Sequence, residues 1–360
     1  MRKILWLGLG TLCAAASAAI GCSSSSSDDS AVSADAGSDA TDLGDGGAEA
    51  SALSADQACG DFAKARCAKI DSCGNGHGVV VKYGDEATCE SRLKVQCLLG
   101  LAAPSTGATA ASRETCAQAL TAEDCPTFLG TDAPDPCAPP AGTLAAGTAC
   151  GSSAQCQSSY CAIPVGTACG TCAAPPTAGA SCATTNECGT SAGLVCLRAT
   201  TTCVAAGAAN ATCDVTHPCA AEYECVKTLD SDGGADGGES ISGTCQLGGT
   251  AVGTKCRGSN VVDPRCERSV YLTCDGMAKT CAQDNFASAG SACGDLDGGV
   301  TDCTAGSSCE TGTCLAPAAE GASCDTANGP SCLSPARCIG TVGDGGTVGI
   351  CTLVDPSTCH

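Results

Sequence analysis

Cysteine is the residue type through which this chain could do the most chemistry. The 360 residues include 36 cysteines, whose thiols can pair as disulfides, hold a metal ion or act as nucleophiles. A cysteine at about one position in ten is typical of disulfide scaffolds, which persist in oxidising compartments. We therefore predict an extracytoplasmic, disulfide-rich protein whose cysteines are structural and which needs no cofactor.

The cysteine spacing between residues 150 and 351 repeats one four-cysteine unit six times. A glycine or a near equivalent lies three residues before each opening cysteine. Unit by unit, the cysteines are Cys150, Cys156, Cys161 and Cys172; Cys182, Cys188, Cys196 and Cys203; Cys213, Cys219, Cys225 and Cys245; Cys256, Cys266, Cys274 and Cys281; Cys293, Cys303, Cys309 and Cys314; and Cys324, Cys332, Cys338 and Cys351. Two extra cysteines, Cys169 and Cys359, could pair with each other or link neighbouring units.

A different eight-cysteine segment, residues 54–140, precedes the repeats. Three-to-four spacing of apolar residues predicts helices from Ser54 to about Ile70, from Asp85 to Leu99 and around residues 112–120. The first two helices each carry two cysteines eight residues apart, near one face, so an antiparallel pair could be stapled at both ends as Cys59–Cys97 and Cys67–Cys89. The other pairings stay open. They involve Cys73, Cys116, Cys125 and Cys137.

Two motifs that resemble catalytic or redox signatures have simpler explanations. Gly189 to Gly193 matches GxSxG, but a nucleophilic Ser191 would need a strand-to-helix turn, and this stretch lies in a short loop between cysteines. Cys169 and Cys172 form a CxxC without a second pair or nearby histidines, which favours a structural role over a metal or redox site. The three histidines, His77, His217 and His360, are far apart, and we expect all three to be exposed.

The acidic loops suggest a calcium site only weakly. Asp230, Asp232, Asp236 and Glu239 lie close together, yet they lack the register and the glycine of an EF-hand loop. Similar Asp-Gly-Gly runs recur at Asp45, Asp297 and Asp344 without further ligands. A solvated low-complexity insert is the favoured interpretation, and we expect no metal.

Residues 1–21 have the features of a signal peptide. Arg2 and Lys3 precede an apolar run from Ile4 to Ala16, which is too short to span a bilayer. The following Ala-Ile-Gly-Cys resembles the lipobox of bacterial lipoproteins, and this resemblance implies that Cys22 carries a lipid anchor in a membrane, with the outer membrane or cell surface favoured. The alternative is plain secretion with Cys22 as an ordinary thiol. Assigning Cys13 to the signal and Cys22 to lipid leaves 34 cysteines, an even number.

Residues 22–53 predict a disordered acidic tether after the lipid. They consist mainly of Ser, Ala, Asp and Gly, with acids and no base. As a random coil, such a segment would hold the folded part about 30 Å from the membrane. Removing Arg2 and Lys3 leaves 15 basic residues against 38 acidic ones, a net charge of −23. This charge disfavours nucleic acid and anionic headgroups as partners.

Residues 147–360 cannot fold around ordinary hydrophobic cores. Beyond the signal peptide the chain has seven aromatic rings, so order in units of about 31 residues must come from cross-links that restrict the unfolded chain. We predict a small disulfide-rich fold: a short disulfide-stapled helical domain, then tandem cysteine-rich repeats of hairpins and turns with little regular secondary structure.

The repeat pattern over residues 147–351 resembles the cysteine-rich repeats of bacterial surface lipoproteins that are likened to the Dickkopf N-terminal domain. The resemblance rests on cysteine and glycine spacing and implies a small extracellular interaction module. We expect a membrane-anchored display, adhesion or recognition protein with a protein or glycan ligand, and not an enzyme. A passive envelope lipoprotein and an inhibitor of secreted proteases are the alternatives. The oligomeric state stays open.

Overall fold

The structure is a computed structural model that describes residues 53–131, 135–138, 140–182, 188, 193–197, 199–220, 223–227, 242–256, 263–296, 299–343 and 346–359. The predicted signal peptide, Cys22 and almost all of the tether lie outside these residues. So do Ser191, His360 and the four acidic residues weighed for calcium.

The segment before the repeats is helical, as predicted. Its elements are α1 (Ala55–Cys73), α2 (Gly78–Tyr83), α3 (Glu86–Ala102), α4 (Ala110–Ala122), α5 (Cys125–Thr131) and the 3-10 helix η1 (Asp135–Cys137). Ser54 caps α1 by accepting a hydrogen bond from the amide of Gln57, which satisfies one of the amides left free at a helix start. The three expected helices are present, and α2 and α5 are additional.

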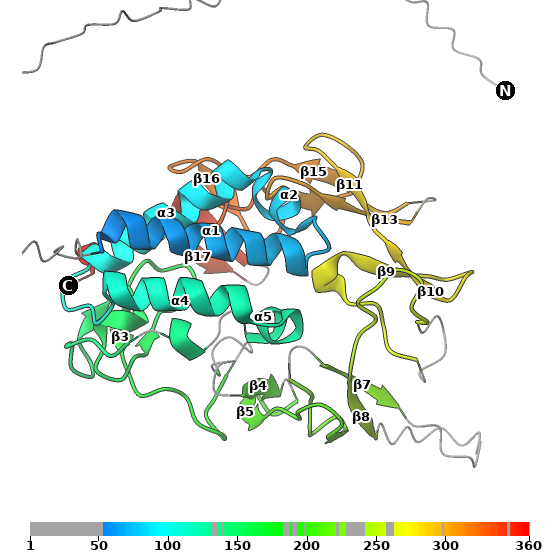
Figure 1. Cartoon of the computed structure of the whole chain (residues 1–360), viewed down its shortest axis with the longest axis horizontal. Helices are drawn as coiled ribbons and strands as arrows, with labels where there is room; N and C mark the ends of the chain where they lie inside the picture. Colours follow the sequence, from blue (N-terminus) through cyan, green and yellow to red (C-terminus); the bar gives the residue numbers. More distant parts are fainter. Residues whose placement is uncertain are drawn as a thin grey trace, which may run out of the picture. The chain divides into compact units, whose positions relative to one another are not determined.

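Helix α1 packs against both α3 and α4 (Figure 1). The α1–α3 pair is stapled by Cys59–Cys97 and Cys67–Cys89, which confirms the pairing inferred from the eight-residue spacing. Cys73–Cys125 joins the end of α1 to the start of α5, and Cys116–Cys137 joins α4 to η1. Buried side chains fill the space between the helices. They include Ile70, Val79, Leu93, Leu120 and Phe128.

Short strands and 3-10 turns make up the repeats. The strands are β1 (Ala149–Cys150), β2 (Cys161–Ala162), β3 (Gly170–Cys172), β4 (Leu194–Leu197), β5 (Thr202–Ala205), β6 (Thr212–Cys213), β7 (Tyr223–Lys227), β8 (Gly243–Leu247), β9 (Leu272–Asp275), β10 (Thr280–Gln283), β11 (Asn285–Ala287), β12 (Gly294–Leu296), β13 (Gly299–Cys303), β14 (Ser308–Glu310), β15 (Thr313–Leu315), β16 (Ser323–Asp325), β17 (Arg337–Gly343) and β18 (Gly346–Thr352). The 3-10 helices are η2 (Ser153–Gln155), η4 (Arg268–Val270) and η5 (Pro356–Thr358).

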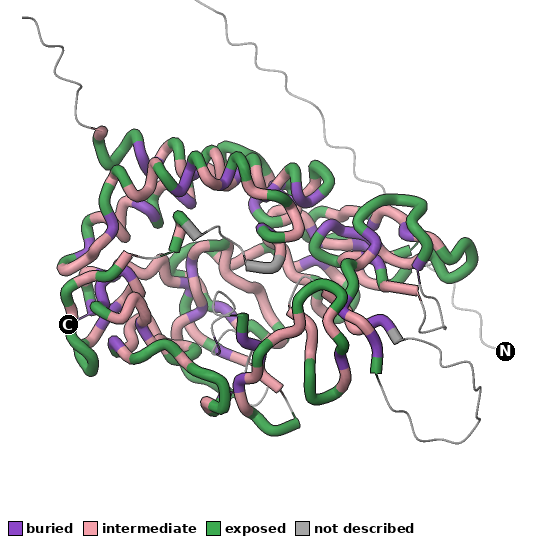
Figure 2. The backbone as a smooth tube through the Cα atoms, turned by 60° about the horizontal axis from the view of Figure 1, so that its bottom comes forward, coloured by how far each residue is buried: buried purple, intermediate pink, exposed green. Residues whose placement is uncertain are grey.

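All six units share one disulfide topology. The third and fourth cysteines lie directly opposite each other on an antiparallel hairpin, as in the Cys161 and Cys172 pair. The first cysteine bonds to the third and the second to the fourth in every unit. The core of a unit is therefore mainly two crossed disulfides. Figure 2 shows short buried stretches along the tube, and most of the buried residues in the repeats are cysteines. This confirms that cross-links replace a hydrophobic core.

A reciprocal pair of backbone hydrogen bonds explains the glycine that opens each unit. The residue three before the first cysteine donates to the carbonyl of the fourth cysteine, whose own amide donates back to the next residue, all at 2.7–2.9 Å. Five of the six opening residues are glycines with φ between +81° and +88°, and the sixth is Asn210 with φ +61°. Asparagine is the non-glycine residue that best tolerates this left-handed backbone, so it is a structural equivalent.

The repeats pack against the helices and do not merely follow them along the chain. Repeat 5 donates the amides of Ala305 and Gly306 to the carbonyls of Val80 and Val81 on α2. In repeat 6, Glu320 forms an ion pair with Arg92 on α3 at 2.9 Å. Repeat 4 accepts a hydrogen bond from Asn75, at the end of α1. The helices and repeats therefore form one unit, in which the helical segment supplies the contact surface for several repeats.

Candidate functional site

The described cysteines are structural. All 34 that we predicted to pair are joined in 17 disulfides. Groups of three sulfurs in the repeats lie within 4.8 Å of one another, a spacing that also suits a metal ion. Each of these sulfurs is already bonded to another, however, and the crossed pair of disulfides accounts for their proximity.

The two cysteines of the CxxC motif are bonded to different partners. Cys172 closes repeat 1 with Cys156, whereas Cys169 bonds to Cys359 near the end of the chain. The two extra cysteines therefore pair with each other, one of the alternatives that the sequence left open. Cys169–Cys359, hereafter the clasp, joins the first repeat to the segment that follows the last one.

The described histidines do not form a catalytic pair. His77 is half-buried and stacks on Phe286 with 4.5 Å between the ring centroids, which corrects the expectation that it is exposed. His217 is exposed, as expected, and its Nδ1 contacts both Asp214 and Thr216. A triad would need the acid and the nucleophile on opposite ring nitrogens. This local Asx turn instead holds the pKa of Asp214 well below its usual range through hydrogen bonds from Thr216 and His217.

Arg268 organises a polar cluster between repeats 4 and 5. Its guanidinium donates to the carboxylates of Asp284 and Asp302 at 2.6 and 3.0 Å, and the side chain of Asp284 is fully buried. Burial raises the pKa of Asp284, and this outweighs the opposite effects of Thr273 and Arg268. The neighbouring Tyr271 packs edge-on against Phe286. These contacts hold repeats 4 and 5 together, so the role of the cluster is structural.

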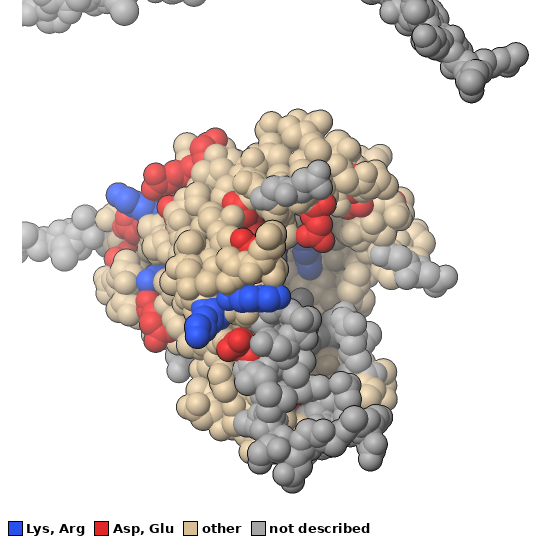
Figure 3. Space-filling view, turned by 90° about the vertical axis from the view of Figure 1, so that its right-hand side faces the viewer, with Lys and Arg blue, Asp and Glu red and all other residues tan. Residues whose placement is uncertain are grey.

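A cavity of about 300 Å³ lies between the helices and repeats 3 and 4. Leu129 of α5, Leu247 of β8 and Val270 of η4 supply apolar walls, and Asn75 and Glu267 supply polar atoms. Among the residues drawn in colour on the face in Figure 3, most are uncharged, and the acidic side chains lie in separate patches with a few basic ones among them.

A second cavity, hereafter the arginine pocket, has a volume of about 400 Å³ and lies where the helices meet repeats 1 and 6. Its charged side chains are Arg113 of α4 and Arg337 of β17. None of the described residues that line it is acidic, although the whole chain has a net charge of −21. The other lining residues are Phe62, Gln96, Cys97, Gly100, Gly151, Ser152, Ile163, Pro335, Leu353, Val354 and Pro356.

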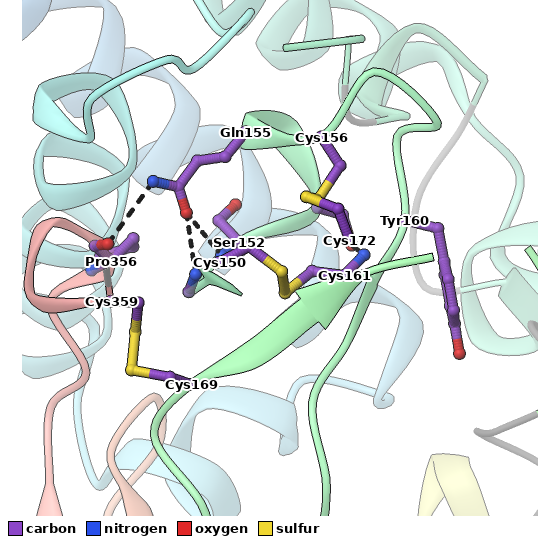
Figure 4. The surroundings of a disulfide bond; sticks show 12 residues. Cys150, Ser152, Gln155, Cys156, Tyr160, Cys161, Cys169, Cys172, Pro356 and Cys359 are labelled. Atoms are coloured by element: carbon purple, nitrogen blue, oxygen red, sulfur yellow. Dashed lines mark hydrogen bonds between the residues drawn. A yellow bond between two sulfur atoms is a disulfide. The ribbon is translucent and has the colours of Figure 1, made fainter. Parts of the chain in front are cut away.

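The buried side chain of Gln155 fixes one wall of the arginine pocket (Figure 4). Its Oε1 accepts hydrogen bonds from the amides of Gly151 and Ser152, at 2.8 and 3.1 Å. Its Nε2 donates to the carbonyl of Pro104 at 3.0 Å and reaches that of Pro356 at 3.5 Å. One amide side chain therefore links repeat 1, the loop before α4 and the C-terminal η5, next to the clasp.

The sequence motifs did not lead to this pocket. Arg113 and Arg337 are 224 positions apart in a chain whose cysteines dominate the pattern, and only the packing of repeat 6 against the helices brings both arginines to one cavity. The one signal in the sequence is the scarcity of basic residues, 17 against 38 acidic ones.

No protein-family model, curated protein or solved structure matches the chain. Within the described ranges, none of the helices is both long and apolar enough to cross a membrane. The 17 disulfides are those of a protein that folds in an oxidising, extracytoplasmic compartment, as the composition predicted.

Proposed function

We propose that this chain is a lipid-anchored protein of the bacterial cell surface that displays a rigid recognition domain and carries out no catalysis. The observation that supports this best is the division of each repeat into a constant frame and variable loops. The frame consists of the crossed disulfides and the reciprocal backbone bonds, which recur in every unit.

The loops differ in length among the repeats, whereas the frame is the same in all six. The third and fourth cysteines are separated by 5 positions in the pair Cys309 and Cys314 and by 20 in the pair Cys225 and Cys245. A frame that tolerates such insertions at small entropic cost suits a module whose binding residues lie on loops. The resemblance of the spacing to surface-lipoprotein repeats supports the same role.

The anchor is tested by replacing Cys22 with Ala in the full chain expressed in a Gram-negative host. We expect palmitate labelling and globomycin-sensitive processing in the parent chain, and loss of both in Cys22→Ala. Cys13→Ala, which changes a cysteine inside the signal peptide, is the matched control and should keep both. Labelling that persists in Cys22→Ala would exclude Cys22 as the lipid site.

Display and recognition are tested on intact cells and on the purified chain. Protease added to whole cells should remove the folded region without lysis, whereas a periplasmic marker stays intact. The native chain, immobilised, should retain a protein or glycan from the producer's surroundings, and the reduced and alkylated chain should not. Retention by neither form would favour a passive envelope role. Protection from protease on whole cells would contradict surface display.

A further inference from the structure

We propose that the arginine pocket binds a small carboxylate that carries an apolar group. This inference rests on the proposed recognition role and names the chemistry of one ligand. It rests on three features of the pocket: two partly buried arginines without acidic partners among the described residues, the apolar and polar residues around them, and rigid walls.

Arg113 is partly buried, and none of the described acidic residues forms an ion pair with it. Its Nε is inaccessible to solvent and has no hydrogen-bond partner within the described part of the chain. The guanidinium lies over the ring of Phe62, with its central carbon 5.7 Å from the ring centroid. Burial alone lowers the pKa of Arg113, because desolvation penalises the charged form. Arg113 also lines the cavity, so an anion bound there would offset the positive charge that burial penalises.

Arg337 brings a second partly buried guanidinium to the same cavity. Its Nη2 donates to the carbonyl of Ala168 at 3.2 Å, which leaves its other donors available. Burial lowers its pKa as well, and among the described residues it has no acidic partner. The planar fork of an arginine matches the two oxygens of a carboxylate, so two forks at one cavity favour that group.

The rest of the lining favours an apolar body on the ligand. Phe62, Ile163, Leu353 and Val354 contribute ring and aliphatic surface, and Gln96 and Ser152 supply polar atoms. The volume of about 400 Å³ falls in the range of about 300–1,000 Å³ that is usual for small-molecule sites. An inorganic anion alone would leave most of this surface uncovered.

The pocket is preformed, because covalent and buried polar links hold its walls. Cys59–Cys97 fixes α1 to α3, and the clasp fixes repeat 1 to the C-terminal segment that contributes Leu353, Val354 and Pro356. Preorganised walls lower the entropic cost of binding.

The test uses the full chain purified from membranes in detergent, with phenylacetate as the probe, by isothermal titration calorimetry. We expect saturable binding, with phenylacetamide and inorganic phosphate each bound at least about 10-fold more weakly, because each lacks one of the two recognised groups. Arg113→Gln and Arg337→Gln should each weaken phenylacetate binding about 10- to 100-fold. The control is Arg265→Gln, an exposed arginine outside the pocket that pairs with Glu224; it should bind as the parent does.

Amide hydrogen exchange on the unsubstituted chain tests the same binding site without a variant, so the result does not depend on whether a variant folds. Phenylacetate should slow exchange around residues 111–115, 335–338 and 353–356 and leave repeats 2 and 3 unchanged. The proposal is overturned by the absence of saturable binding, by equal binding of the amide, by tighter binding of phosphate, or by affinity that survives both substitutions. These results concern the pocket alone, whereas the whole-cell protease and Cys22 experiments test display and anchoring independently.

Discussion

Cys169 and Cys359 are joined by a disulfide across 190 positions of sequence, the longest separation among the 17 bonds. Every other disulfide closes within the helical segment or within one repeat, over 11 to 52 positions. The clasp is therefore the one cross-link that joins the start of the repeat array to its end. It also lies beside the Gln155 hydrogen bonds and the arginine pocket.

Removing the clasp should lower the stability of the fold while the two disulfides inside each repeat stay intact. For a Cys169→Ala, Cys359→Ala double variant we expect a loss of about 2–4 kcal/mol in the free energy of unfolding, because the unfolded chain regains entropy. Guanidinium unfolding measures the loss, and mass spectrometry checks that the other 16 bonds form. Ser357→Ala, two residues from Cys359, is the control. An unchanged unfolding midpoint in the double variant would show that the clasp adds nothing to stability.

Substitution of the opening glycines should destabilise the fold because of their left-handed backbone conformation. A Cβ at Gly290 would meet no atom within 4 Å, so only its φ of +86° penalises a side chain. Gly290→Ala should cost about 1–2 kcal/mol, whereas Gly60→Ala, inside α1 and equally unobstructed, should stabilise the fold by about 0.5–1 kcal/mol. Thermal unfolding of both variants compares them. Equal effects of the two substitutions would contradict the account of the opening residue.

Gln155 should be far more sensitive than its exposed neighbour Gln157. In Gln155→Leu the amides of Gly151 and Ser152 and the carbonyl of Pro104 lose their partner, so we expect about 2–4 kcal/mol of destabilisation from buried unpaired groups. Gln157→Leu removes one exposed contact to Thr143 and should change stability by less than about 0.5 kcal/mol. Chemical denaturation measures both variants, and similar losses would refute the role given to Gln155.

Tyr271 should ionise well above the usual range for a phenol. Burial raises its pKa to about 12, with smaller contributions from the carboxylates of Asp302 and Asp71. The folded chain holds this proton more tightly than the unfolded chain, whose tyrosine titrates near about 10. The resulting stability is present below pH ~10 and is lost as pH rises through ~12. The absorbance at 295 nm of the parent minus Tyr271→Phe, recorded by rapid mixing, reports the midpoint. A midpoint near 10 would contradict burial of the phenol.

Local spacing was enough to predict three of the helices, the stapled pair and the six four-cysteine units, but not the crossed bonds inside each unit. Cysteines eight residues apart on two helices restrict the possible pairings, and the Cys59–Cys97 and Cys67–Cys89 bonds follow from that geometry. The opening position that recurs in each unit reflects one backbone requirement, which glycine or asparagine satisfies. These features depend on residues close together in sequence.

Contacts between distant segments could not be predicted in the same way. The burial of His77 depends on Phe286, which comes from repeat 5, and the arginine pocket depends on repeat 6 packing against α1, α3 and α4. Nothing in the spacing of the cysteines specifies which faces of the repeats meet the helices. The pairing of Cys169 with Cys359 stayed open for the same reason, because it joins segments that only the tertiary packing brings together.

Disulfide mapping of the chain isolated from its producing cells would show whether six identically crossed units and one clasp hold this protein together. Pepsin digestion at low pH suppresses thiol exchange, and mass spectrometry then identifies the linked peptides. We expect first-to-third and second-to-fourth bonds in every repeat, Cys169 linked to Cys359, and no free thiol among residues 59–359. Free thiols, or bonds that join one repeat to its neighbour, would contradict the account.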